Sequence, residues 1–135
     1  ENQLQPQEEF MGLDQYASNF LSDGDQPNQQ HISESHFTWR KHSKLHQFMT
    51  DIWVANGGDA DEFNCQPLKL TKENIIDLQR RIKLGILPQS NGGFFFGHQW
   101  QDEASQEYRE QDLEFCEWAL DQFDQGLPVY YDCWW

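Results

Sequence analysis

The residues best suited to bind a ligand lie close together in the sequence: Trp39, Arg40 and His42. An arginine guanidinium can hold a carboxylate or a phosphate through paired hydrogen bonds. One interpretation is therefore an anion-ligand site in which Arg40 holds the anion and the ends of aromatic strands complete the walls.

His42 and His46 are four residues apart, so a helix would place both imidazoles on one face. This spacing can chelate a metal ion. However, no Glu lies between them, as the HExxH motif would require, and no third ligand is evident. The pattern favours a solvated polar face of the helix, and we predict no metal and no cofactor.

Nucleophilic catalysis needs an activated cysteine or serine beside a base. Cys116 falls on an apolar helical face and Cys133 in the last expected strand, which predicts two buried structural thiols. Ser90 lies in a loop that does not resemble a nucleophile elbow. The sequence therefore predicts no catalytic residue. Three cysteines without a CxxC pair indicate a reducing cytoplasm.

The overall charge excludes some classes of partner. A formal charge of −14 repels phosphate, so direct binding to nucleic acid or to an anionic membrane is not expected. No stretch approaches the roughly 20 apolar residues of a membrane span. The N-terminal region is polar and shows no signal peptide, although the sequence opens with Glu1 and leaves the native start open. We expect a cytoplasmic protein that suits a basic protein partner.

The charges are also unevenly placed along the chain. Eight of the nine basic residues fall between Arg40 and Lys83, whereas residues 85–135 hold ten acids and one base. Contact between these regions would allow a homodimer or docking within one chain; chance segregation remains an alternative. The acidic face expected on the last helix also carries Glu103, Asp112 and Asp124, and its predicted interaction residues are Glu107, Glu110, Glu114, Glu117 and Asp121.

Apolar spacing predicts three helices, over residues 38–55, 72–84 and 103–124. Thr71 is a good N-cap for the second helix, and Gly85 ends it. The Asn-Gly-Gly sequence at residues 56–58 ends the first helix, and Gly126 ends the third. Short strands are predicted at residues 63–70 and 94–96.

The last strand is predicted to open at Pro128 and to run to Trp135. It carries four large aromatic residues among its last six. Burying each ring contributes roughly 1.5–3 kcal/mol, so we expect an interior or well-covered strand that tolerates a C-terminal extension poorly.

Residues 1–36 contain seven acids and no Lys or Arg, and we interpret them as an acidic arm. Helical spacing predicts a short helix over residues 8–21, followed by a mobile linker over residues 22–36. The predicted fold is α+β: a domain over residues 37–135, with about three helices packed on about three strands, plus the arm. Docking of the arm in cis or in trans is left open.

Several motifs resemble a family of small proteins from bacteriophages and some bacteria. They are the WRKH sequence at residues 39–42, FFFG at residues 94–97 and YYDCWW at residues 130–135. Members of this family end in a sequence of the YYDSWW type, so Cys133 stands where the family pattern has a serine. The resemblance covers residues 38–135 and implies a phage or marine bacterial origin but no reaction. Some members carry the label phosphoglycerate kinase, which requires two large lobes and a phosphate-binding loop that this sequence lacks.

Two functional hypotheses follow. The favoured one is a non-enzymatic protein-binding module that acts on a host protein through its acidic faces. The alternative is a small enzyme or anion-ligand binder with a site around Trp39, Arg40 and His42.

Overall fold

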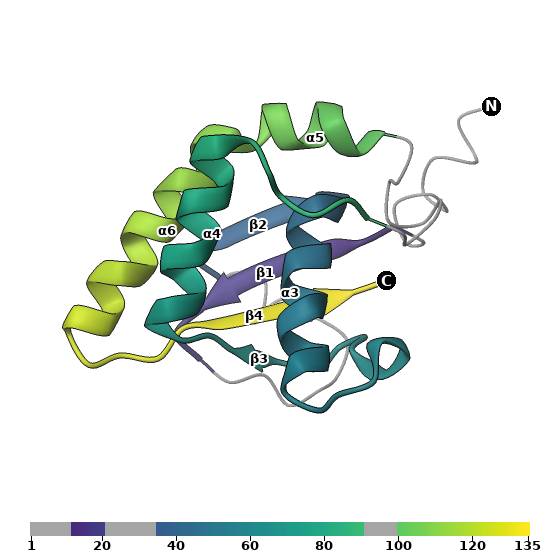
Figure 1. The fold of residues 1–135 in the computed structure, drawn as a ribbon. Helices are drawn as coiled ribbons and strands as arrows, with labels where there is room; N and C mark the ends of the chain where they lie inside the picture. Colours follow the sequence, from purple (N-terminus) through teal and green to yellow (C-terminus); the bar gives the residue numbers. More distant parts are fainter. Residues whose placement is uncertain (1–11, 21–34, 91–99) are drawn as a thin grey trace.

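A four-stranded antiparallel sheet forms one layer of the fold, and helices cover one of its faces (Figure 1). The computed structural model describes residues 12–20, 35–90 and 100–135. The predicted α+β class is confirmed, and the described residues form four strands and four helices rather than about three of each. The strands are β1 (Asp14–Ser18), β2 (Phe37–Arg40), β3 (Leu68–Lys69) and β4 (Tyr130–Trp134); the helices are α3 (Ser43–Ala55), α4 (Lys72–Leu84), α5 (Gln101–Glu107) and α6 (Arg109–Asp124), with a 3₁₀ turn, η1, at Ala60–Glu62.

β1 is an interior strand of the sheet, in the order β2-β1-β4-β3. The helix predicted over residues 8–21 is therefore wrong at residues 14–18. The predicted boundary at residue 36, between the acidic arm and the domain, is also wrong for residues 14–18, because β1 pairs with both β2 and β4. Alternation along the strand places Gln15 and Ala17 on one face, where both are buried.

α3 begins later than predicted, because residues 38–40 belong to β2. Lys41 has a φ of 58° and turns the chain between the strand and the helix. The predicted end of the helix is confirmed, with Asn56 at the C-cap and Gly57 at a φ of 100°.

α4 has the predicted boundaries. The Thr71 hydroxyl accepts a hydrogen bond from the Asn74 backbone N–H at 3.1 Å, and the Asn74 side-chain oxygen accepts one from the Thr71 backbone N–H at 2.9 Å. This capping box satisfies two donors at the start of the helix. Gly85 ends the helix in the left-handed region, with a φ of 70°.

The helix predicted over residues 103–124 is instead two helices that meet at Tyr108. The Tyr108 hydroxyl accepts a hydrogen bond from the Arg40 backbone N–H at 3.0 Å, and its ring stacks on that of His42. These contacts hold the break against β2 and the start of α3. β4 follows as predicted and lies between β1 and β3, so its predicted interior position is confirmed.

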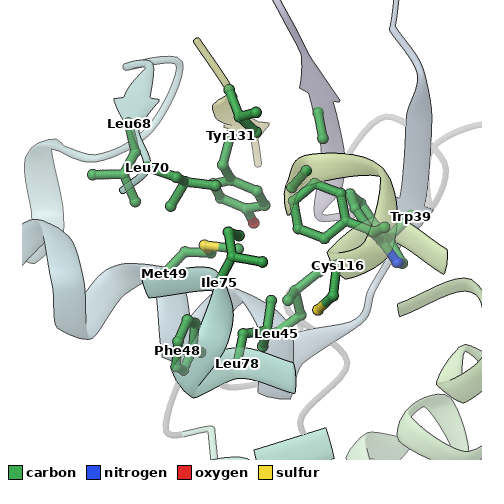
Figure 2. Packing of buried hydrophobic residues seen from close by; sticks show 14 of the residues in the cluster. Trp39, Leu45, Phe48, Met49, Leu68, Leu70, Ile75, Leu78, Cys116 and Tyr131 are labelled. Atoms are coloured by element: carbon green, nitrogen blue, oxygen red, sulfur yellow. The ribbon is translucent and has the colours of Figure 1, made fainter. Parts of the chain in front are cut away.

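The core lies between the sheet and α3, α4 and α6. Figure 2 shows Met49 of α3, Ile75 of α4 and Tyr131 of β4 converging in this layer, and none of the three is exposed. The predicted strand at residues 63–70 is reduced to Leu68–Lys69. The predicted strand at residues 94–96 and residues 22–34 of the predicted linker lie outside the described residues.

Candidate functional site

The predicted ligand residues divide between the interior and the surface. Trp39 and His42 are buried, with exposed fractions of 2% and 0%. Arg40 is partly exposed, and its guanidinium pairs with the Asp14 carboxylate of the neighbouring strand at 2.9 Å. The strand alternation of β2 separates Trp39 from Arg40, because successive residues point to opposite faces. His42 lies outside the strand, at the N-cap of α3. The three side chains do not form one ligand site.

Trp39 and His42 instead meet at Asp112, in the first turn of α6. The Trp39 indole N–H donates to Asp112 Oδ1 at 2.8 Å, and His42 Nε2 lies 2.7 Å from Oδ2. Asp112 is only 1% exposed, so its predicted place on the acidic face is wrong. An amphipathic pattern assigns an aspartate to the solvent face, whereas here a buried indole and imidazole satisfy the carboxylate.

The Asp112–His42 pair resembles part of a catalytic triad, but no nucleophile of the described residues joins it. A triad needs a hydroxyl or thiol on the second imidazole nitrogen. Within the described residues, His42 Nδ1 is buried and has no hydrogen-bond partner. The arrangement therefore joins β2, α3 and α6 by polar contacts that a hydrophobic core cannot supply.

His46 forms a second buried network with Gln15 and Tyr131. The Gln15 amide donates to the Tyr131 hydroxyl at 3.1 Å, and His46 Nδ1 lies 2.8 Å from the same oxygen. We infer that the tyrosine donates its proton to Nδ1, which requires a neutral imidazole. Burial lowers the pKa of His46 to about 3. The predicted solvated face for the two histidines is therefore wrong.

The cysteines predicted to be structural are buried. Burial raises the pKa of the Cys116 thiol to about 12 and that of Cys133 well above its ordinary value. A thiol must ionise to act as a nucleophile, so the raised pKa values disfavour such a role for either cysteine at neutral pH. Among residues 12–20, 35–90 and 100–135, no three His, Cys, Asp or Glu side chains form a group that could hold a metal ion.

The predicted interaction residues are exposed, and they divide between two helices. A spacing of three or four residues places Glu110, Glu114, Glu117 and Asp121 on one face of α6. Glu107 lies on α5, before the break at Tyr108, and Glu103 lies four residues earlier on the same face of α5. We call this surface the acidic ridge; it consists of Glu103, Glu107, Glu110, Glu114, Glu117 and Asp121.

A pocket opens at the α5 end of the acidic ridge. It has a volume of about 470 Å³, and its walls include Trp100, Glu103 and Glu107. The Trp100 side chain is 59% exposed. Arg40 and Lys41 line the same pocket. Trp100 is not among the predicted site residues, although its spacing of three and seven residues from the two glutamates could have indicated a shared face.

An exposed indole beside carboxylates suits a cationic side chain. The ring face attracts a cation, and the carboxylates supply charge-assisted acceptors.

No protein-family model, curated protein or solved structure matches the chain. Within the described residues, no helix combines the length and apolar character needed to cross a membrane.

Proposed function

We propose that the protein is a non-enzymatic binding module whose acidic ridge docks a basic segment of a partner protein. The observation that carries this proposal is the Trp100 pocket at one end of the ridge. The indole and two glutamates would anchor one Lys or Arg of the partner, and the α6 carboxylates would meet further cations. From Glu110 to Asp121 the ridge extends about 16 Å, which matches a short extended peptide.

Two cations that line the same pocket limit which partner fits. Arg40 and Lys41 would repel a uniformly basic segment at this end, and they would favour a carboxylate or carbonyl group beside the anchoring cation. The motif resemblance to phage proteins suggests that the partner is a host protein. A second copy of this chain is the alternative occupant, because four of its nine basic residues lie on α4: Lys72, Arg80, Arg81 and Lys83.

The test is a titration of the protein with a synthetic lysine-rich peptide that contains one glutamate. Glu114→Lys combined with Glu117→Lys should weaken binding about tenfold or more, because two attractions become repulsions. Asp61→Lys combined with Glu62→Lys is the matched control. It changes the net charge equally at exposed positions away from the ridge.

Trp100→Ala should also weaken binding, whereas the matched control pair should change it less than twofold. Equal losses in both charge-reversed variants would show that net charge alone attracts the peptide and would overturn the proposal. Sedimentation of the protein alone tests whether it forms a homodimer. A dimer that is lost when Glu114→Lys and Glu117→Lys are combined would identify a second copy as the occupant.

A further inference from the structure

A second pocket lies on the other side of α5. It has a volume of about 470 Å³, within the range of small-molecule sites, and residues of α3, α4, α5 and α6 line it. Helical spacing sets Asp102, Ser105 and Gln106 on the face of α5 toward this pocket, and Glu103, Ala104 and Glu107 toward the Trp100 pocket.

Three cations line this pocket: Lys44, Arg81 and Arg109. The whole chain has only nine Lys and Arg against 23 acids, so their convergence sets this pocket apart from the overall charge. Two carboxylates also line it. Asp102 pairs with Lys44 at 2.7 Å, and Asp112 is held by the buried His42.

The two arginines differ in how they are already engaged. The Arg81 guanidinium contacts Asp77 at 3.2 Å on its own helix and lies 5.6 Å from the centre of the Phe48 ring. Arg109 makes no ion pair with any residue that the structure describes. Arg109 therefore lines the pocket without being paired to a carboxylate of the described residues.

A neutral donor and an apolar wall complete the pocket. The Ser105 hydroxyl is buried and has no hydrogen-bond partner within the described ranges. Ile82 and Leu87 supply an apolar surface. An unpartnered buried hydroxyl is costly, which a ligand that accepts its hydrogen bond would relieve.

We propose that this pocket binds a small organic oxyanion, a phosphate monoester or a carboxylate on an apolar body. Arg109 and Arg81 hold the oxyanion, Ser105 donates a hydrogen bond to it, and Ile82 and Leu87 contact the apolar body. The field of a protein with a net charge of −14 repels anions, so saturable binding of one requires such a local site. This proposal is independent of the acidic ridge.

Isothermal titration with phenyl phosphate, benzoate and inorganic phosphate tests the site. We expect one saturable site for phenyl phosphate or benzoate and weaker binding of inorganic phosphate, which lacks the apolar body. Phenyl phosphate stronger than benzoate would identify the ligand as a phosphate ester, and the reverse order as a carboxylate. Leu87→Ala should weaken the two aromatic probes while leaving inorganic phosphate unchanged.

Arg109→Gln should weaken the preferred probe about tenfold or more, through loss of a charge-assisted hydrogen bond. Arg80→Gln is the matched control. Arg80 neighbours Arg81 and also pairs with Asp77, but it does not line the pocket, so binding should change less than twofold. Arg109 is exposed, so its substitution should leave the near-ultraviolet circular dichroism unchanged.

Two results would overturn the proposal: no saturable binding of any probe, or equal weakening in Arg80→Gln and Arg109→Gln. Neither depends on whether the basic peptide binds the acidic ridge, because the Arg109→Gln variant keeps the ridge intact.

Discussion

Asp112 has one buried partner for each carboxylate oxygen, so its removal leaves both an indole N–H and an imidazole unpaired. We expect Asp112→Ala to lower the free energy of unfolding by about 3–5 kcal/mol. Urea denaturation measures this loss. Glu114→Ala, an exposed substitution on the same helix, should stay within about 0.5 kcal/mol of the wild type.

A double-mutant cycle separates the Asp112–His42 contact from the general cost of truncation. If the pair interacts, Asp112→Ala and His42→Ala together should cost less than the sum of the single variants, by about 0.5–3 kcal/mol. Additive losses would contradict the interaction.

Neutral His46 makes stability depend on pH. The unfolded chain takes up a proton near the ordinary pKa of about 6.5, whereas folding lowers the pKa of His46 to about 3. Between these values the unfolded state binds more protons, so stability falls as the pH falls, by up to about 1.4 kcal/mol per pH unit. His46→Phe cannot protonate and should lack this contribution.

Urea midpoints of the wild type and His46→Phe at pH 7, 6 and 5 measure the contribution of His46. The wild type should lose stability relative to the variant at each step, and parallel curves would contradict the assignment. In a nuclear magnetic resonance titration, the His46 ring should stay neutral down to about pH 4 while the protein remains folded.

At the scale of elements, the last strand is held at its end by a side chain as well as by the sheet. Asn64 accepts a hydrogen bond from the Trp135 backbone N–H at 2.9 Å and donates one to its carbonyl at 3.1 Å. Trp134 pairs with Asp14 of β1. These contacts attach the strand end to the turn after η1 and to the centre of the sheet.

Deleting Trp134 and Trp135 should therefore unfold the domain or lower its urea midpoint strongly, because ladder pairing and two partly buried rings are lost together. Asn64→Ala keeps both rings and should cost only about 1–2 kcal/mol, from its two hydrogen bonds. A shortened chain with an unchanged midpoint would show that this strand end is peripheral.

The elements also show where the sequence was informative. Strong signals such as the Thr71 cap and the Gly85 stop predicted α4, because its ends depend on local backbone chemistry. β1 was missed because its stability is not local: the Gln15 amide exchanges two hydrogen bonds with the His42 backbone, 27 residues away. A hydrophobic pattern cannot detect a polar side chain that is buried by such distant partners.

The candidate sites also differ in whether they depend on local sequence or on contacts between distant residues. The exposed acids of α6 were predicted from helical spacing alone, since solvent exposure follows from the apolar face opposite them. The pocket proposed to bind an oxyanion could not be predicted from the sequence, because its three cations belong to three different helices and meet only through tertiary packing. They are Lys44, Arg81 and Arg109.

For the whole molecule, the excess of acids over bases produces long-range electrostatic repulsion between carboxylates. The arginines of α4 pair with Asp77 of their own helix, so they do not neutralise the acidic ridge by direct ion pairs in the described residues. Most of the charge on α6 therefore remains uncompensated and opposes the folded state through mutual repulsion.

Salt should then stabilise the protein. The screening length falls from about 30 Å at 0.01 M to about 8 Å at 0.15 M ionic strength, which removes most repulsion between separated carboxylates. We expect the melting temperature to rise over this range of NaCl. The rise should be smaller in a Glu114→Gln, Glu117→Gln variant, in which two ridge charges are absent. A melting temperature that falls with salt would mean that attraction between the basic residues of α4 and the ridge outweighs repulsion. Light scattering in the same samples would then show whether that attraction acts within one chain or between two copies.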